Sequence, residues 1–265
     1  MFRLKRLVEP TREDFVTEKK YRKGYDSYSE YNYIGSRIDR KAKKLHFNKA
    51  LYLALKRGSN QTVVDFGCGD GFFLPSLSTY FSEVFGIEQN SRFVRTACEL
   101  TVRRKLQNTQ VFCNAIQDER DLMYVRLNQK ADTLFAMEVI EHVGDKYDMY
   151  RSKSEFIEDL FKLVQPSGKI IISVPVMVGI PFLIQRAAMK ILGIYGAKIS
   201  LSQFFKCVLL KNTDGLEKKW AGGHLGFNHI KLEAELSKHF NLVSHSVFFS
   251  KLYEITPMKK DLFTK

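Results

Sequence analysis

The chain has 265 residues, of which 45% are hydrophobic and 27% charged, and its formal net charge is +13. These values are ordinary for a soluble globular protein with a sizeable core, and they exclude a low-complexity chain. The four cysteines show no paired spacing and no secretory signal precedes them, which predicts reduced thiols and a cytoplasmic location. The longest uncharged stretch, residues 170–185, is shorter than the roughly 20 residues of a membrane span, so we expect no transmembrane helix.

The positive charge is uneven along the chain. In residues 1–60, lysine and arginine outnumber the acids by more than two to one. Such a bias favours an anionic partner, which could be nucleic acid, a phospholipid surface or a phosphorylated substrate. It is equally consistent with a solvated basic surface that keeps the protein in solution.

In chain order, residues 1–35 are polar, basic and rich in tyrosine, which indicates an arm or lid. Apolar residues at helical intervals predict a helix over 36–56. Short apolar strands then alternate with helices, which predicts an α/β fold around a parallel sheet. The expected strands cover 62–66, 83–87, 110–113, 132–137 and 169–174, and the expected helices begin at 72 and cover 91–105 and 154–164.

Residues 176–213 interrupt this alternation. They hold five basic residues and no acid, around the apolar patterns "IPFLIQRAAMKIL" and "LSQFFKCVLL", which predicts a helical insertion. The chain therefore divides into an N-terminal arm and helix (1–58), a core (59–175), a helical insertion or substrate cap (176–228), and a C-terminal helix with strands that complete the core (229–265).

The stretch "VVDFGCGDGFF", residues 63–73, places alternate glycines directly after an apolar strand. Such a turn lets a ligand approach the backbone, and the next helix offers its amide groups. The spacing G-x-G-x-G differs from the dinucleotide fingerprint, and no G-K-[ST] follows, which excludes the phosphate loop. Glu88 ends the next strand, where an acid accepts hydrogen bonds from both hydroxyls of a ribose.

Five stretches, in this order and spacing, resemble the class I S-adenosylmethionine-dependent methyltransferases: "VVDFGCGDG", "VFGIEQN", "VFCNA", "DTLFAMEVIEHV" and "LVQPSGKIIISVP". The resemblance covers about residues 60–175. It implies a Rossmann-like, doubly wound, mostly parallel seven-stranded sheet with helices on both faces. To this it adds an N-terminal helical arm and a helical insertion after strand five. It also implies S-adenosylmethionine as the cofactor and S-adenosylhomocysteine as the product.

The same resemblance implies the cofactor-binding residues Asp65, Gly67, Cys68, Gly69, Glu88, Gln89, Asn114, Ala115 and Glu138. Asp65 and the backbone of the first two glycines would hold the methionine part, and Glu88 the ribose. Gln89, Asn114 and Ala115 would flank the adenine. The family commonly has aspartate where Asn114 stands, so here the amide oxygen would have to accept from the adenine amino group.

The motif "AMEVIEHV" is similar to the "EVIEH" stretch of ubiquinone-biosynthesis O-methyltransferases and of small-RNA 3′-terminal 2′-O-methyltransferases. In the latter group, two glutamates and two histidines hold a metal. The matching residues are Glu138, Glu141 and His142, with His224 or His229 as a fourth ligand. Alternatively, Glu138 lines the cofactor pocket while Glu141 and His142 pair with nearby groups. The alternative is commoner across the wider family, so a divalent metal is not favoured and we assign no residue as a metal ligand.

Methyl transfer from a sulfonium needs in-line positioning and a base for the acceptor proton. His142 and His224 are the candidate catalytic bases, since neutral imidazole works near its own pKa. We expect an enzyme that O-methylates a small-molecule, lipid-linked or glycan-pathway acceptor. The alternatives are an RNA 2′-O-methyltransferase, with or without a metal, and a non-catalytic binding protein that keeps the cofactor fold.

The composition of the helical insertion (176–228) suggests what this part of the chain contacts. Arg186 and Lys190 beside its apolar residues would suit peripheral contact with an anionic membrane. Alternatively, the apolar residues pack as a cap over the substrate pocket or at a dimer interface. The sequence does not fix the oligomeric state.

Overall fold

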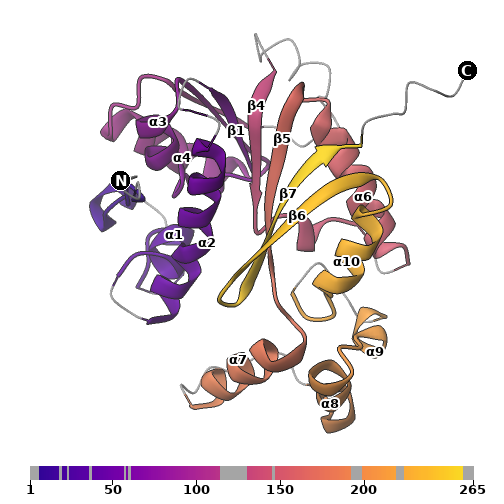
Figure 1. The fold of residues 1–265 in the computed structure, drawn as a ribbon. Coiled ribbons are helices and arrows are strands. Elements are labelled where there is room, and N and C mark those ends of the chain that lie inside the picture. The colour runs from indigo at the N-terminus through magenta and orange to yellow at the C-terminus, as the bar shows by residue number, and fades with distance from the viewer. Residues whose placement is uncertain are drawn as a thin grey trace, which may run out of the picture. The chain divides into compact units, whose positions relative to one another are not determined.

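The computed structural model describes residues 6–17, 20–22, 24–35, 38–56, 58, 61–113, 130–144, 147–191, 199–218 and 224–258. Seven strands form one sheet in the order β3-β2-β1-β4-β5-β7-β6 (Figure 1). The predicted Rossmann-like, mostly parallel sheet of seven strands is therefore confirmed. The chain divides into two compact units, the first made of Met1–Met137 with Phe161–Ile171 and the second of Glu138–Leu160 with Ile172–Lys265.

The first unit contains four parallel strands. They are β1 (Thr62–Phe66), β2 (Glu83–Glu88), β3 (Thr109–Cys113) and β4 (Ala131–Met137). β1 lies between β2 and β4, and Asp65 is in register with Gly86 on one side and Phe135 on the other. Every residue of β1 is buried, which explains its nearly continuous apolar sequence.

Three helices of the first unit pack on these strands: α2 (Ile38–Leu55), α3 (Leu74–Tyr80) and α4 (Ser91–Arg103). Two shorter elements, η1 (Arg12–Phe15) and α1 (Tyr28–Asn32), contact each other, and η1 packs on α4. α4 begins where Asn90 caps it, since the Asn90 side chain accepts a hydrogen bond from the Arg92 amide. Its buried face, with Ala97 and Leu100, lies on the side of β2 and β3.

The predicted arm is anchored on this unit. The Arg104 side chain, just beyond α4, donates from Nε to the Asp14 carboxylate at 2.8 Å. Arg103 donates to the Asp14 carbonyl oxygen at 2.8 Å. The arm is thus held to α4 by charge-assisted hydrogen bonds, which are stronger than neutral ones.

The second unit contains the antiparallel hairpin of β6 (Phe240–Val247) and β7 (Ser250–Pro257), visible in yellow in Figure 1. Its helical elements are η2 (Ile140–His142), α6 (Met149–Phe161), α7 (Gly179–Ile191), α8 (Leu201–Leu209), α9 (Asp214–Glu217) and α10 (His229–Leu236). The expected helical character of the insertion is confirmed for its described residues. Ser200 and Gln203 form a capping box that starts α8.

Most element boundaries lie within three residues of the predictions, and the largest differences are at the starts of β5 and α6. β5 runs from Val164 to Pro175, beginning before the expected residue 169. Gly168 lies within this longer strand, and only glycine fits there because an added Cβ would lie 2.4 Å from a methyl group of Val164. α6 begins at Met149 rather than 154, because Met149 and Lys153 belong to its buried face. Among the described helices, none is both long and apolar enough to cross a membrane.

Candidate functional site

The glycine loop after β1 has the backbone shape that its sequence predicts. Gly67, Gly69 and Gly71 all have positive φ, at 72°, 57° and 95°. A side chain would be strained at each of these positions. Gly71 has a second role, because an added Cβ would lie 3.3 Å from the Cα of Ala97 in α4. The alternate glycines thus serve both the turn and the close approach of a helix.

Glu88, at the end of β2, is tied to this loop. Its carboxylate accepts hydrogen bonds from the Gly69 amide at 3.0 Å and from the Asn90 amide at 2.8 Å. The carboxylate therefore links the glycine loop to the start of α4 without any ligand. A carboxylate offers about four acceptor sites, so capacity remains for two hydroxyl groups.

Asp65 is the penultimate residue of β1, just before the glycines, and is 3% exposed. Burial, and then the charge of Glu88, raise the pKa of Asp65 to about 7. Both causes act against its ionised form. A cationic group of a ligand beside Asp65 would stabilise that form, as expected for the methionine ammonium.

The other predicted cofactor residues of the first unit have different surroundings. The buried Cys68 thiol packs against β2, where an added Cβ on Gly86 would lie 3.1 Å from its sulfur. Burial raises the pKa of Cys68 well above its usual value, so it is an inert packing residue. Gln89 is exposed, and Asn114 and Ala115 lie outside the described residues.

A connection between the arm and the glycine loop was not predicted. The Ser29 amide donates to Asp70 Oδ2 at 2.8 Å, and the Ser29 hydroxyl donates to Oδ1. Both residues are buried, and Asp70 lies within "GCGDG" itself. The S-x-x-E pattern of Ser27 and Glu30 could have predicted the start of α1, because Ser27 caps this helix by accepting from the Glu30 amide. It does not indicate the contact with Asp70.

In the second unit, Glu138 follows β4 directly in a left-handed conformation, with φ of 59°. Its amide donates to the carbonyl oxygen of Ser173 at 3.2 Å and to the Ser173 hydroxyl at 3.0 Å. A non-glycine residue in this region is uncommon and persists only where the surroundings hold it. The expected part of Glu138 in cofactor binding stays a prediction.

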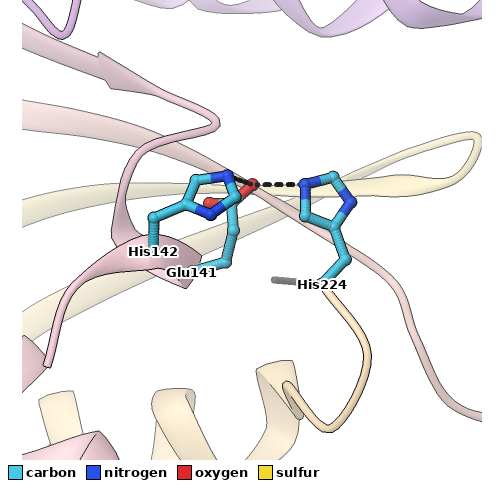
Figure 2. A group of neighbouring side chains, drawn as sticks. All are labelled: Glu141, His142 and His224. Carbon is cyan, nitrogen blue, oxygen red and sulfur yellow. Dashed lines mark ion pairs between the residues drawn. The ribbon is translucent and has the colours of Figure 1, made fainter. Parts of the chain in front are cut away.

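Three residues of the second unit converge, as Figure 2 shows: Glu141, His142 and His224. The Glu141 Oε1 atom lies 3.5 Å from His224 Nε2 and 4.0 Å from His142 Nε2. One ligand atom of each residue lies within 4.8 Å of the other two. Both histidine side chains are nearly half exposed, at 48% and 43%, so the cluster is open on one side.

The Glu141 carboxylate is buried, and neither of its oxygens has a hydrogen-bond donor among the described residues. Burial, followed by the nearby charge of Glu138, raises the pKa of Glu141 well above its usual value. A buried carboxylate without donors is costly. Two ligands of one Zn-like ion lie about 3.3–4.3 Å apart, which fits the spacing seen here. The residues present therefore suit a divalent cation.

Buried Lys153 positions the turn that carries two of these residues. Its ammonium group donates to the Val143 carbonyl oxygen and, at 3.4 Å, to that of Glu141. Burial lowers the pKa of Lys153 to about 8, against the opposing charge of Glu141. Lys153 thus fixes η2 from inside the fold, a role that the sequence did not reveal.

The turn that carries His224 is also held. The Phe227 amide donates to the His224 carbonyl oxygen at 3.2 Å. Gly226 has φ of 95°, and an added Cβ would lie 3.0 Å from the Leu216 carbonyl oxygen. Asn228 then caps α10 and donates to the Lys211 carbonyl oxygen at 2.9 Å.

His229, the other histidine considered as a fourth ligand, is not part of the cluster. It begins α10 and is 8% exposed, and burial lowers its pKa to about 4. Its environment is that of a core residue. The structure thus selects His224 rather than His229, and Glu138 is likewise not a member of the group.

Comparison with known proteins gives the family. A family model described as "Methyltransferase domain" matches residues 37–205, which is more than half of the chain. The ubiquinone biosynthesis O-methyltransferase of Proteus mirabilis (strain HI4320) is 29% identical over 111 residues. That match spans 42% of this chain and 40% of the relative's length.

Solved structures share the fold at low identity. The N-methyltransferase NodS of Bradyrhizobium japonicum WM9, in complex with S-adenosyl-l-homocysteine, has a TM-score of 0.52 at 14% identity, covering 84% of this chain and 90% of its own. The magnesium protoporphyrin IX methyltransferase of Synechocystis PCC 6803, with bound S-adenosylhomocysteine, has a TM-score of 0.52 at 15% identity and covers 85% and 90%. The PH0226 protein of Pyrococcus horikoshii OT3 reaches a TM-score of 0.55 at 17% identity, with 89% and 99% covered.

The glycine loop, Asp65 and Glu88 supply the features expected of a cofactor site, and the family match covers the segment that contains them. The resemblance inferred from the motifs is therefore confirmed. The chain belongs to the methyltransferase domain family, whose model matches residues 37–205.

Proposed function

We propose that this chain uses S-adenosylmethionine to transfer a methyl group to an oxygen of a small acceptor, and that the acceptor hydroxyl is activated at Glu141, His142 and His224. The observation that carries the proposal is the buried Glu141 carboxylate, which has no hydrogen-bond donor in the part of the chain that the structure describes and whose Oε1 lies 3.5 Å from His224 Nε2. A purely structural glutamate would have partners, since buried polar groups almost always do.

The acceptor class is supported by the curated relative, whose name specifies O-methylation in ubiquinone biosynthesis. The solved neighbours include an enzyme named as an N-methyltransferase, so the shared fold alone does not determine the acceptor atom. The open cluster favours oxygen, because a hydroxyl must lose a proton to become a good nucleophile.

Glu141, His142 and His224 would hold a divalent ion, and two imidazoles with one carboxylate suit a transition metal better than calcium or magnesium. When bound, such an ion supplies charge that lowers the pKa of a hydroxyl group. The buried carboxylate binds and orients the histidines, while the exposed imidazole faces leave room for an acceptor. Without an ion, either imidazole could take the acceptor proton directly.

The position of the cluster in the chain supports the proposal as well. Glu141 follows Met137, the last residue of β4, by only a few residues. In Rossmann-like sheets, ligands bind beyond the carboxyl ends of the strands. The cluster thus stands at a point in the chain that is suited to an acceptor.

The test compares the wild type with Glu141→Gln, which keeps the shape and removes the charge. Protein treated with a chelator is titrated with Zn²⁺, Mn²⁺ and Mg²⁺ by calorimetry and melted with and without each ion. S-adenosylhomocysteine release is then measured with phenols, carboxylates, sugars, amines and a short RNA with a free 3′-terminal ribose. Glu235→Gln is the matched control, because Glu235 lies 3.9 Å from His239 in a comparable Glu–His pair.

We expect a transition-metal ion to raise the melting temperature of the wild type and of Glu235→Gln, but not of Glu141→Gln. Release should occur with a hydroxyl acceptor and fall by at least about 100-fold in Glu141→Gln. Full activity of Glu141→Gln would refute the role of the cluster. Turnover confined to RNA would favour the RNA alternative, and turnover confined to amines would refute O-methylation. Activity that survives the chelator but is lost on substitution of His142 or His224 would show that a histidine acts as the base and that no metal ion is needed.

A further inference from the structure

The insertion has an exposed apolar stripe on α7. Ile180, Leu183, Ile184 and Ile191 are all exposed, and Ile191 is 85% exposed. Their spacing places them on one side of the helix. Phe182, on the other side, is fully buried. α7 is thus apolar toward solvent as well as toward the protein.

The neighbouring helix α8 has the same property (Figure 1). Leu201, Phe205 and Leu209 recur every fourth residue and are exposed, with Leu201 at 77%. Cys207, on the opposite side, is buried. Two adjacent helices therefore present apolar stripes, a feature that we call the outer face of the insertion.

The outer face is not left over from an incomplete core. Phe182 and Cys207 pack with Met177 and Leu216 in a buried cluster, and Phe204 packs against it. The insertion has its own core, so the exposed residues are not needed to hold α7 and α8 together. Several large apolar side chains exposed on two neighbouring helices are typical of a site of interaction.

The charge of the insertion specifies the partner. No acid occurs from Val176 to Thr213. Lys190, Lys206 and Lys211 are exposed, and Arg186 is partly exposed. Apolar side chains with cations and no anions match an anionic lipid surface, where aliphatic groups enter the interface and lysines meet the phosphates.

We propose that the outer face of α7 and α8 binds an anionic phospholipid membrane surface. A second copy of the chain is a poorer partner, because two identical faces would bring their cations together without any acid between them. No membrane-spanning helix is required, since helices of this type lie in the plane of the interface. The proposal is independent of the acceptor and of the cluster at Glu141.

The experiment is co-sedimentation of the full chain with vesicles of phosphatidylcholine alone or with about 30% phosphatidylglycerol, at low and high salt. We expect binding only to the anionic vesicles and weaker binding at high salt. Lys190→Gln combined with Lys206→Gln should weaken binding by about 25-fold, since each lysine near such a surface contributes about fivefold.

The apolar contribution is tested with Ile191→Glu and Phe205→Ser. Val102→Glu is the matched control, because Val102 is an apolar helical residue that is 77% exposed outside the insertion. Ile191→Glu and Phe205→Ser should each lose binding while the control keeps it, with melting temperature and cofactor affinity unchanged in all three. Absence of wild-type binding to anionic vesicles, or wild-type binding by both insertion variants, would overturn the proposal. So would a dimer in sedimentation equilibrium that Ile191→Glu converts to monomer.

Discussion

The two acidic centres of this enzyme are built in opposite ways. Glu88 in the first unit already accepts two backbone hydrogen bonds, from Gly69 and Asn90. Glu141 in the second unit is more deeply buried and has no hydrogen-bond donor among the described residues. The glycine loop is therefore held by the protein's own hydrogen bonds to Glu88, whereas a cation or a proton would stabilise the buried Glu141 carboxylate. Substitutions should separate the two.

The largest effect is expected for His224→Ala. Loss of an imidazole that serves as base or as metal ligand should lower kcat by about 10²–10⁴-fold. Cofactor affinity, measured by calorimetry, should stay at the wild-type value because the glycine loop is intact. His239→Ala, at another histidine paired with a glutamate, should retain activity. A parallel loss of cofactor affinity in His224→Ala would show that the two centres are not independent.

Asp65→Asn should have the next largest effect, and on the opposite centre. Removal of the charge expected to hold the methionine ammonium should weaken cofactor binding by about 100-fold. Metal binding at the second centre should not change. Glu83→Gln provides the control, because Glu83 lies at the start of β2, at the opposite end of that strand from Glu88. Unchanged cofactor affinity in Asp65→Asn would overturn the assignment of Asp65.

The same residue predicts a pH dependence. The pKa of Asp65 is raised to about 7 from 3.8, so the neutral carboxyl is favoured without the cofactor. The free energy of unfolding should therefore fall as pH rises from 3.8 toward 7, because the buried carboxyl loses its proton. A cofactor ammonium favours the ionised form. Cofactor affinity should therefore rise by up to about tenfold per pH unit below pH 7 and level off above it. Calorimetry at several pH values should show this slope in the wild type and a flatter one in Asp65→Asn.

The smallest effect concerns the connection between arm and loop. Ser29→Ala removes the hydroxyl that donates to Asp70 and should lower the free energy of unfolding by about 1–2 kcal/mol, because the buried carboxylate loses a donor. Denaturant unfolding measures this. Ser237→Ala, where the hydroxyl donates to a carbonyl oxygen on the surface, should change stability much less. Equal effects of the two substitutions would show that the Asp70 contact contributes little.

Local sequence was enough to predict the strands and the glycine loop of the first unit. β1 has the expected bounds because "TVVDF" is buried throughout and is followed by glycines that force a turn. Glu88 was recognisable because it follows the glycine loop at the end of the next strand. These signals depend on neighbours in sequence or on a regular alternation of elements, which a single chain displays directly.

The second centre could be predicted only in part. "EVIEH" indicated Glu141 and His142, but the choice of His224 over His229 depends on which histidine α10 buries. Lys153 was not recognised because a lysine is rarely expected on the buried face of a helix. The contact between Ser29 and Asp70 joins residues that are 41 positions apart and leaves no periodic trace.

That contact has a consequence for the order in which the protein forms. During synthesis the arm leaves the ribosome before its partners Asp70 and Arg104, which are made later. Non-local contacts are slow to form because the intervening chain must be ordered first. The arm is thus fixed in place only after the glycine loop and the end of α4 have been made. A chain shortened to begin at residue 59 would lose the Ser29 contact with Asp70 and also the fully buried Leu51 and Leu53 of α2.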